Sequence, residues 1–271
     1  MFYPFSIAVN ILQVQPKGIP TIALIFLILP WALAFFYSLY VLAVIYDIQI
    51  PKLFRYLNRL PATHVTILQK DFRFYQKLNN EEKQKFENRV NHFLINKTFL
   101  GKSIEITDEM RVMISASAVQ LTFGLHPVYL SHFNTITIVP AGHFPVYDRK
   151  DFTIGWHDFI AGYSDHRDGY NPGLQKIATM LSLEHRICKE KKYIFRPYRY
   201  LQWKNTSEKE AIRWIRAGVT RFRSIKEINE HDYFATAVVY FFEQPEDFRS
   251  RFPELFDALK HLLRQNPMRY L

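Results

Sequence analysis

Ten histidines invite a search of this sequence for a metal site. No two of them are four residues apart, so no helix can present the paired imidazoles that commonly hold zinc. His157 and Asp158, followed by Asp165 and His166, form a loose polar cluster that we expect in a loop. Such clusters are more often solvated loop than a binding site. His157, Asp158 and His166 are therefore kept only as a weak alternative metal site.

Other chemistry-bearing patterns are missing from the sequence. It has no phosphate-binding loop, dinucleotide fingerprint or nucleophile elbow. Its single cysteine, Cys188, excludes a disulfide framework within the chain. Basic and aromatic residues interleave over Lys189–Lys204, a composition that can bind nucleic acid or lipid head groups. We favour lipid, since the sequence also predicts a membrane segment, and we do not expect nucleic acid, a cofactor or a small-molecule substrate.

The membrane segment is predicted from an uncharged stretch, Gly18–Tyr46, whose part Thr21–Tyr46 is almost wholly apolar. As a helix this part would reach ~39 Å, enough to cross a hydrocarbon core of ~30 Å with some tilt. A signal peptide is the competing interpretation, but its apolar core is usually ~7–15 residues long. We therefore expect one transmembrane helix over about 21–46, kinked at Pro30.

The flanking charges predict the orientation of this helix. Only Lys17 precedes it, whereas Lys52, Arg55 and Arg59 follow, so the C-terminal side is expected to be cytoplasmic. The chain is thus predicted to be a single-pass protein of the bacterial inner membrane. Its net charge of +10 lies entirely after residue 50, because Lys17 and Asp47 cancel before that point. A basic body is attracted to the anionic inner leaflet, by ~1 kcal/mol for each Lys or Arg near the surface.

The remainder, residues 51–271, is expected to form one cytosolic domain after an N-terminal segment of residues 1–50. A hydrophobic content of 48% excludes a disordered chain. Hydrophobic periodicity and capping residues predict a mostly helical α+β fold with a small sheet. Helices are expected over Asn80–Phe99, Thr107–Phe123, Asn171–Lys189, Ser207–Arg223, Asp232–Glu243 and, at the surface, Pro253–Arg264, and strands over Ser103–Ile106, Asn134–Val139 and Phe152–Trp156.

Several of these segments carry the motifs of a known family. From about Phe72 to Pro267 the chain resembles the Mlc titration factor A family of zinc-dependent peptidases. The matching stretches are Phe93–Leu125, Ile136–Pro140, Trp156–Gly162, Asp168–Asn171 and Tyr233–Pro245. The resemblance implies a zincin-like domain whose active-site helix follows Asn171.

That helix carries the motif H-E-x-x-H in the family. The two histidines hold zinc, the glutamate activates the bound water, and a later glutamate resembles the third ligand. Here the ligand positions read Gln175 and Thr179, the base position reads Lys176, and the later ligand position reads Val239. Amide and hydroxyl groups are weak zinc ligands, and a protonated lysine is no base. We therefore expect no zinc site, with Lys176 filling part of the vacated space near a carboxylate.

The resemblance and its departures predict a function without catalysis. The segment between Pro140 and Trp156 is shorter than the hairpin of the family pattern, which puts peptide binding by strand addition in doubt. We expect a membrane-anchored, catalytically inactive peptidase-like protein that binds the lipid bilayer and a membrane-protein partner. The alternatives are an active zinc peptidase with a displaced metal site, and a regulator that binds a transcription factor or nucleic acid.

Overall fold

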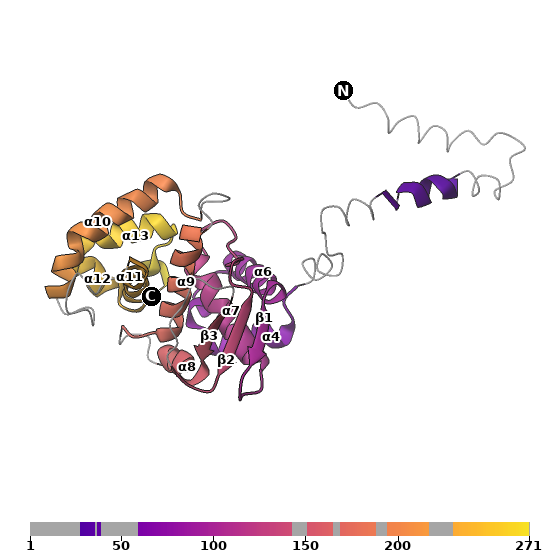
Figure 1. Cartoon of the computed structure of the whole chain (residues 1–271), viewed down its shortest axis with the longest axis horizontal. Helices are drawn as coiled ribbons and strands as arrows, with labels where there is room; N and C mark the ends of the chain where they lie inside the picture. The colour runs from indigo at the N-terminus through magenta and orange to yellow at the C-terminus, as the bar shows by residue number, and fades with distance from the viewer. Residues whose placement is uncertain are drawn as a thin grey trace, which may run out of the picture. The chain divides into compact units, whose positions relative to one another are not determined.

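The computed structural model describes residues 28–35, 37–38, 59–142, 151–164, 169–187, 194–216 and 230–270. The chain divides into two compact units, Met1–Leu57 and Asn58–Leu271. Figure 1 shows the second unit as a small sheet with helices packed around it.

The first unit is described over residues 28–35 and 37–38, which are helical. Six large apolar side chains of this helix are about half exposed or more: Ile28, Leu29, Trp31, Leu33, Phe35 and Tyr37. The rest of the predicted membrane span, residues 21–46, lies outside the described residues. Among the helices that are described, none combines the length and apolar character needed to cross a membrane. The membrane span therefore stays a prediction.

The second unit is mostly helical, as predicted. Its elements are α4 (Ala62–Asp71), α5 (Arg73–Gln76), α6 (Asn80–Asn96), β1 (Thr98–Gly101), α7 (Asp108–Thr122), β2 (Thr135–Val139), β3 (Asp151–Gly155), α8 (Trp156–Ser164), α9 (Pro172–Ile187), α10 (Pro197–Arg216), α11 (Glu230–Glu243), α12 (Pro245–Arg251), α13 (Pro253–Leu263) and the 3-10 helix η3 (Pro267–Tyr270). α9 lies centrally, packed against α7, α8 and α11.

The described strands form a parallel sheet in the order β1-β2-β3. The predicted strands at 134–139 and 152–156 are confirmed to within a residue. The predicted strand at Ser103–Ile106 is wrong, because β1 lies earlier, at Thr98–Gly101, and overlaps the end of the predicted helix Asn80–Phe99. The contacts of Lys97 and the backbone conformation of Ser103 explain the difference. The buried Lys97 ammonium binds the carbonyl groups of Leu130 and Phe133 beside the sheet, and Ser103 has a left-handed φ of 61°, which a strand does not tolerate.

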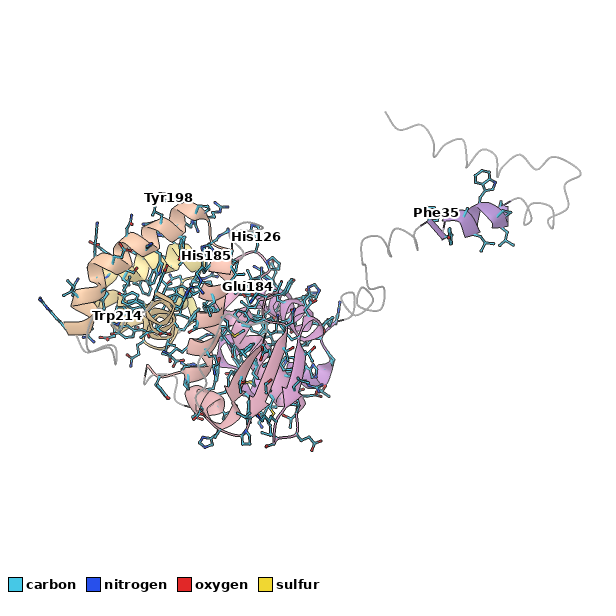
Figure 2. All side chains as sticks on the ribbon, in the orientation of Figure 1. Phe35, His126, Glu184, His185, Tyr198 and Trp214 are labelled. Atoms are coloured by element: carbon cyan, nitrogen blue, oxygen red, sulfur yellow. The ribbon has the colours of Figure 1, made fainter. Side chains whose placement is uncertain are left out.

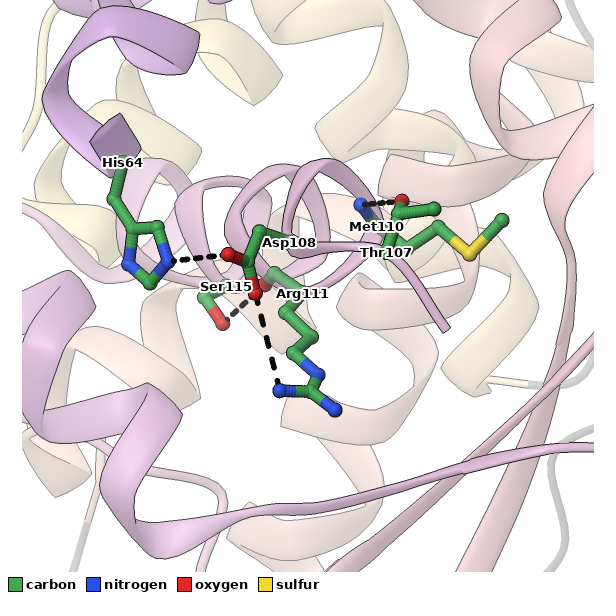
Figure 3. A network of polar contacts seen from close by, with 6 residues as sticks. All are labelled: His64, Thr107, Asp108, Met110, Arg111 and Ser115. Atoms are coloured by element: carbon green, nitrogen blue, oxygen red, sulfur yellow. Dashed lines mark hydrogen bonds and ion pairs between the residues drawn. The ribbon is translucent and has the colours of Figure 1, made fainter. Parts of the chain in front are cut away.

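Side-chain caps fix two helix starts, of which the cap at Thr107 was predicted and the cap at Asn79 was not. At α6, the Asn79 side chain accepts from the Glu82 amide, while the Glu82 carboxylate accepts from the Asn79 amide. At α7, the Thr107 hydroxyl accepts from the Met110 amide at 3.3 Å, as Figure 3 shows. Asp108 at the same end lies 3.4 Å from His64 of α4, so the start of α7 is also tied to its neighbour.

One prediction about the C-terminal helices is wrong in detail. α10 begins at Pro197, ten residues before the predicted start, and the Ser207 hydroxyl donates to the Lys204 carbonyl inside the helix instead of capping it. α13, predicted as a surface helix, exposes Asp257 and His261 on one face and buries Leu255 and Leu259 on the other. Its apolar face packs on α10 and α12. Sequence periodicity finds such a face but does not show how deeply it is covered.

Candidate functional site

The start of α9 is fixed by Asn171, as the sequence predicts. Its side-chain oxygen accepts from the Leu174 amide at 2.8 Å, which caps the helix. Its side-chain nitrogen donates to the Gly162 carbonyl at 3.0 Å and to the Glu243 carboxylate at 3.1 Å. One buried amide therefore joins α9 to the ends of α8 and α11.

Replacing Asn171 with alanine is expected to lower the free energy of unfolding by about 2 kcal/mol, because the cap and two donated hydrogen bonds are lost. Asn171→Asp keeps the capping acceptor but places a second carboxylate beside Glu243, so it should also destabilise the protein. Chemical denaturation followed by circular dichroism measures both. Full stability in either variant would contradict this role for Asn171.

The positions aligned with zinc ligands lie on two neighbouring helices. Gln175 and Thr179 lie one turn apart on α9, where the Thr179 hydroxyl donates to the Gln175 carbonyl at 3.1 Å. Val239 lies on α11, which packs against α9, and its side chain is buried. The hydroxyl of Thr179 is thus used within its own helix.

Lys176, at the position aligned with the catalytic base, is directed towards the sheet. Its ammonium group donates to the carbonyl oxygen of Thr153 in β3 at 2.5 Å. Burial lowers the pKa of Lys176 to about 8, opposed by the negative charge of Asp158. The side chain is therefore partly buried, and the Thr153 carbonyl group is a contact that was not predicted from the sequence.

The carbonyl group that Lys176 contacts belongs to the outer edge of β3. The Lys102 amide donates to the Ile138 carbonyl. The main-chain amide and carbonyl groups of even-numbered residues in β2 therefore point towards β1, and those of odd-numbered residues, such as Thr137, point towards β3. Thr153 is opposite Thr137, so its own amide and carbonyl point away from β2. Among the described strands, β3 is an edge strand. Lys176 therefore occupies an acceptor that a strand added to this edge would need.

The weak alternative metal site is not assembled by the described residues. His157 and Asp158 lie in the helix α8, not in the predicted loop, because the chain turns into a helix directly after β3. The Asp158 carboxylate accepts from the Gly142 amide at 2.9 Å. His166 lies outside the described residues. In the ranges that are described, no three His, Cys, Asp or Glu side chains gather as a metal site would require.

Sequence reasoning missed a buried charged pair at the other end of α9. The Glu184 carboxylate accepts from the His132 amide, and the nearby Lys97 ammonium binds two carbonyl groups of the same loop before β2. Burial lowers the pKa of Lys97 to about 8 and raises that of Glu184. Figure 2 labels Glu184 and the neighbouring His185. The sequence does contain a sign of this burial, because the helical spacing of Leu174 and Ile177 places Glu184 on the same apolar face of the helix.

The basic and aromatic stretch Lys189–Lys204 is described from residue 194 onward, and part of it is structural. Trp203 is buried, and the Arg199 guanidinium donates to the His261 carbonyl at 2.7 Å. In contrast, Tyr198, labelled in Figure 2, is 76% exposed at the start of α10. The stretch thus supplies core contacts on one side and an exposed aromatic surface on the other.

A cavity of about 490 Å³ lies apart from the positions aligned with the zinc site. It is lined by residues of α5, α8, the end of α7, the α11–α12 junction and η3. Its walls combine aromatic rings with one arginine and three carboxylates. No local sequence pattern predicts this cavity, because its residues come from segments far apart in the chain.

Comparison with known proteins supports the resemblance seen in the motifs. Residues 53–171 match the family model of the glucose-regulated metallo-peptidase M90, which corresponds to the Mlc titration factor A-like peptidases. The match ends at Asn171, one residue before α9, and thus before the helix that carries Lys176. No curated protein sequence matches the chain. By this match, residues 53–171 of the chain are similar to the glucose-regulated metallo-peptidase M90 family.

Proposed function

We propose that this chain is a membrane-anchored, catalytically inactive zinc-peptidase-like protein that serves as a binding or structural subunit of a membrane-associated complex. One observation carries the proposal. Lys176 stands at the position of the catalytic base, and its ammonium group binds the Thr153 carbonyl. A cation held in this place supplies neither a base nor a metal ligand.

The neighbouring positions support the same conclusion chemically. Zinc in catalytic sites is held by imidazole, carboxylate or thiolate groups, together with a water that it activates. Gln175, Thr179 and Val239 provide an amide, a hydroxyl and an alkyl group instead. Lys176 would add electrostatic repulsion against a dication. The residues present therefore do not fit the family's zinc ion, and no hydrolytic step is derived through it.

The lysine contact also bears on peptide binding. Peptides often bind to an exposed sheet edge by pairing main-chain groups with those of the edge strand. Here the Thr153 carbonyl, which faces outward from β3, is already bonded to Lys176. A peptide would have to displace this partly buried ammonium to pair there. A partner is more readily bound through the surface of the domain than as an extended strand on β3.

Membrane attachment is supported by apolar exposure and by charge. The helical residues 28–35 and 37–38 expose apolar side chains such as Trp31 and Leu33, which suit a lipid or protein environment better than water. The excess positive charge after residue 50 suits an anionic leaflet. Exposed Tyr198 and Leu201 on α10 add apolar surface to this basic body.

Metal analysis of the full-length protein, purified in mild detergent and dialysed against zinc, tests the proposal. We expect far less than stoichiometric zinc and no peptidase activity on an unstructured protein substrate. Stoichiometric zinc would contradict the proposal. The variant His157→Ala combined with His166→Ala is the matched control, since zinc that disappears in this variant would locate an active, displaced site.

A further inference from the structure

We propose that the cavity between α5, α8, the α11–α12 junction and η3 binds a small zwitterion with an apolar side chain, such as a free amino acid or dipeptide. Its volume of about 490 Å³ is large enough for such a ligand. None of the zinc-aligned positions lines it. The inference therefore goes beyond the proposed function and does not depend on the absence of catalysis.

The apolar part of the ligand would meet a preformed aromatic wall. Phe72 and Phe74 are buried beneath the cavity, at 1% and 8% exposure. Phe74 contacts Tyr270 of η3 with ring centroids 4.7 Å apart, and Phe72 contacts Tyr163 of α8 at 5.6 Å. Because these rings are already packed on one another, little ordering is needed when a ligand binds.

The charged residues of the cavity include both signs. Asp247 lies 3.6 Å from Arg251 and accepts from the Tyr240 hydroxyl, so its charge is largely compensated. Arg73, at the first position of α5, forms no ion pair with any part of the chain that the structure describes. The same holds for Glu246 at the start of α12. A ligand carboxylate would suit the arginine, and a ligand ammonium the glutamate.

A second carboxylate of the cavity is held in place by the fold. One oxygen of Glu243 accepts from the Asn171 side chain, which also caps α9. Tyr163 also lines the cavity and is bonded to the Ser117 hydroxyl. This anchoring fixes the position of the Glu243 carboxylate, a negative group of the cavity, whereas Arg73 provides a positive group. A molecule with both charges and an apolar body matches all three features.

Calorimetric titration of the full-length protein in mild detergent tests the proposal with three probes. L-phenylalanine carries both charges, phenylalaninamide lacks the carboxylate, and N-acetylphenylalanine lacks the ammonium. We expect phenylalanine to bind with a Kd between about 10 μM and 1 mM. Each analogue should bind at least about tenfold more weakly, because one charge-assisted contact is lost. Failure of phenylalanine to bind at ~10 mM, or binding of either analogue as tightly as phenylalanine, would overturn the proposal.

Two variants link the binding to the named residues. Arg73→Ala should weaken phenylalanine binding about tenfold and abolish the preference over phenylalaninamide. Glu246→Ala should reduce the preference over N-acetylphenylalanine. Arg111→Ala is the control, since Arg111 lies near Asp108 on α7 and does not line the cavity. If Arg73→Ala keeps both the affinity and the preference while unfolding at the temperature of the unaltered protein, the assignment of Arg73 is wrong.

Discussion

Replacing Lys176 with glutamate is expected to destabilise the domain by about 3 kcal/mol, because a partly buried carbonyl oxygen loses its donor and gains a carboxylate as its neighbour. The new carboxylate would face the Thr153 carbonyl oxygen, which now accepts from the ammonium. It would also add to the negative charge of Asp158 nearby. Although this change restores the residue type of the catalytic base, it should create no peptidase activity, because the ligand positions stay unchanged.

Lys176→Met is the matched control for length and volume. It removes one hydrogen bond but also a buried charge, so we expect a change of less than about 1.5 kcal/mol at pH 7. Urea denaturation of the three proteins measures the difference. A glutamate variant as stable as the unaltered protein would contradict this prediction.

The difference in stability between the unaltered protein and Lys176→Met is expected to depend on pH. The pKa of Lys176 is lowered by burial from 10.5 to about 8, so between these pH values the unfolded chain binds a proton that the folded chain lacks. The stability of the unaltered protein, measured relative to Lys176→Met, should therefore rise as pH increases from about 8 to 10.5. Below pH 8 the lysine is charged in both states, and the full cost of burying it remains. A difference that does not change with pH would contradict this burial.

Replacing Trp214 with alanine is expected to cost about 3–5 kcal/mol, the usual range for a large aromatic side chain in a core. Trp214 of α10 is completely buried. Its ring contacts Phe252 at a centroid distance of 5.1 Å, Tyr233 at 5.3 Å and Phe248 at 5.4 Å. Alanine would leave a cavity where α10, α11 and α12 meet. Figure 2 labels Trp214 at this place.

The control for this prediction lies on the same helix. Tyr198 is 76% exposed, so Tyr198→Ala should change stability by no more than about 0.5 kcal/mol. Thermal unfolding monitored by circular dichroism compares the two variants. Equal effects would mean that α10 is held mainly by contacts outside the aromatic cluster around Trp214.

Local sequence patterns predicted the helix starts that depend on neighbouring residues. Asn171 and Thr107 cap their helices as expected, because a cap needs only a side-chain oxygen and an amide three residues later. Strand prediction succeeded at Thr135–Val139, where β-branched residues alternate. Strand prediction failed at Thr98–Gly101. The position of this strand depends on the contact of Lys97 with a loop more than thirty residues away in the chain, which no local pattern shows.

The sequence by itself determined that no two histidines are four residues apart, and the family resemblance places Gln175, Lys176 and Thr179 where a zinc peptidase has histidines and a glutamate. The tertiary structure decided what takes their place. The Lys176 contact with Thr153 joins residues 23 positions apart. The cavity collects Arg73, Glu246 and Tyr270 from three distant segments. Such contacts depend on how helices pack against one another and against the sheet, and packing geometry is a property of the whole chain that no local pattern encodes.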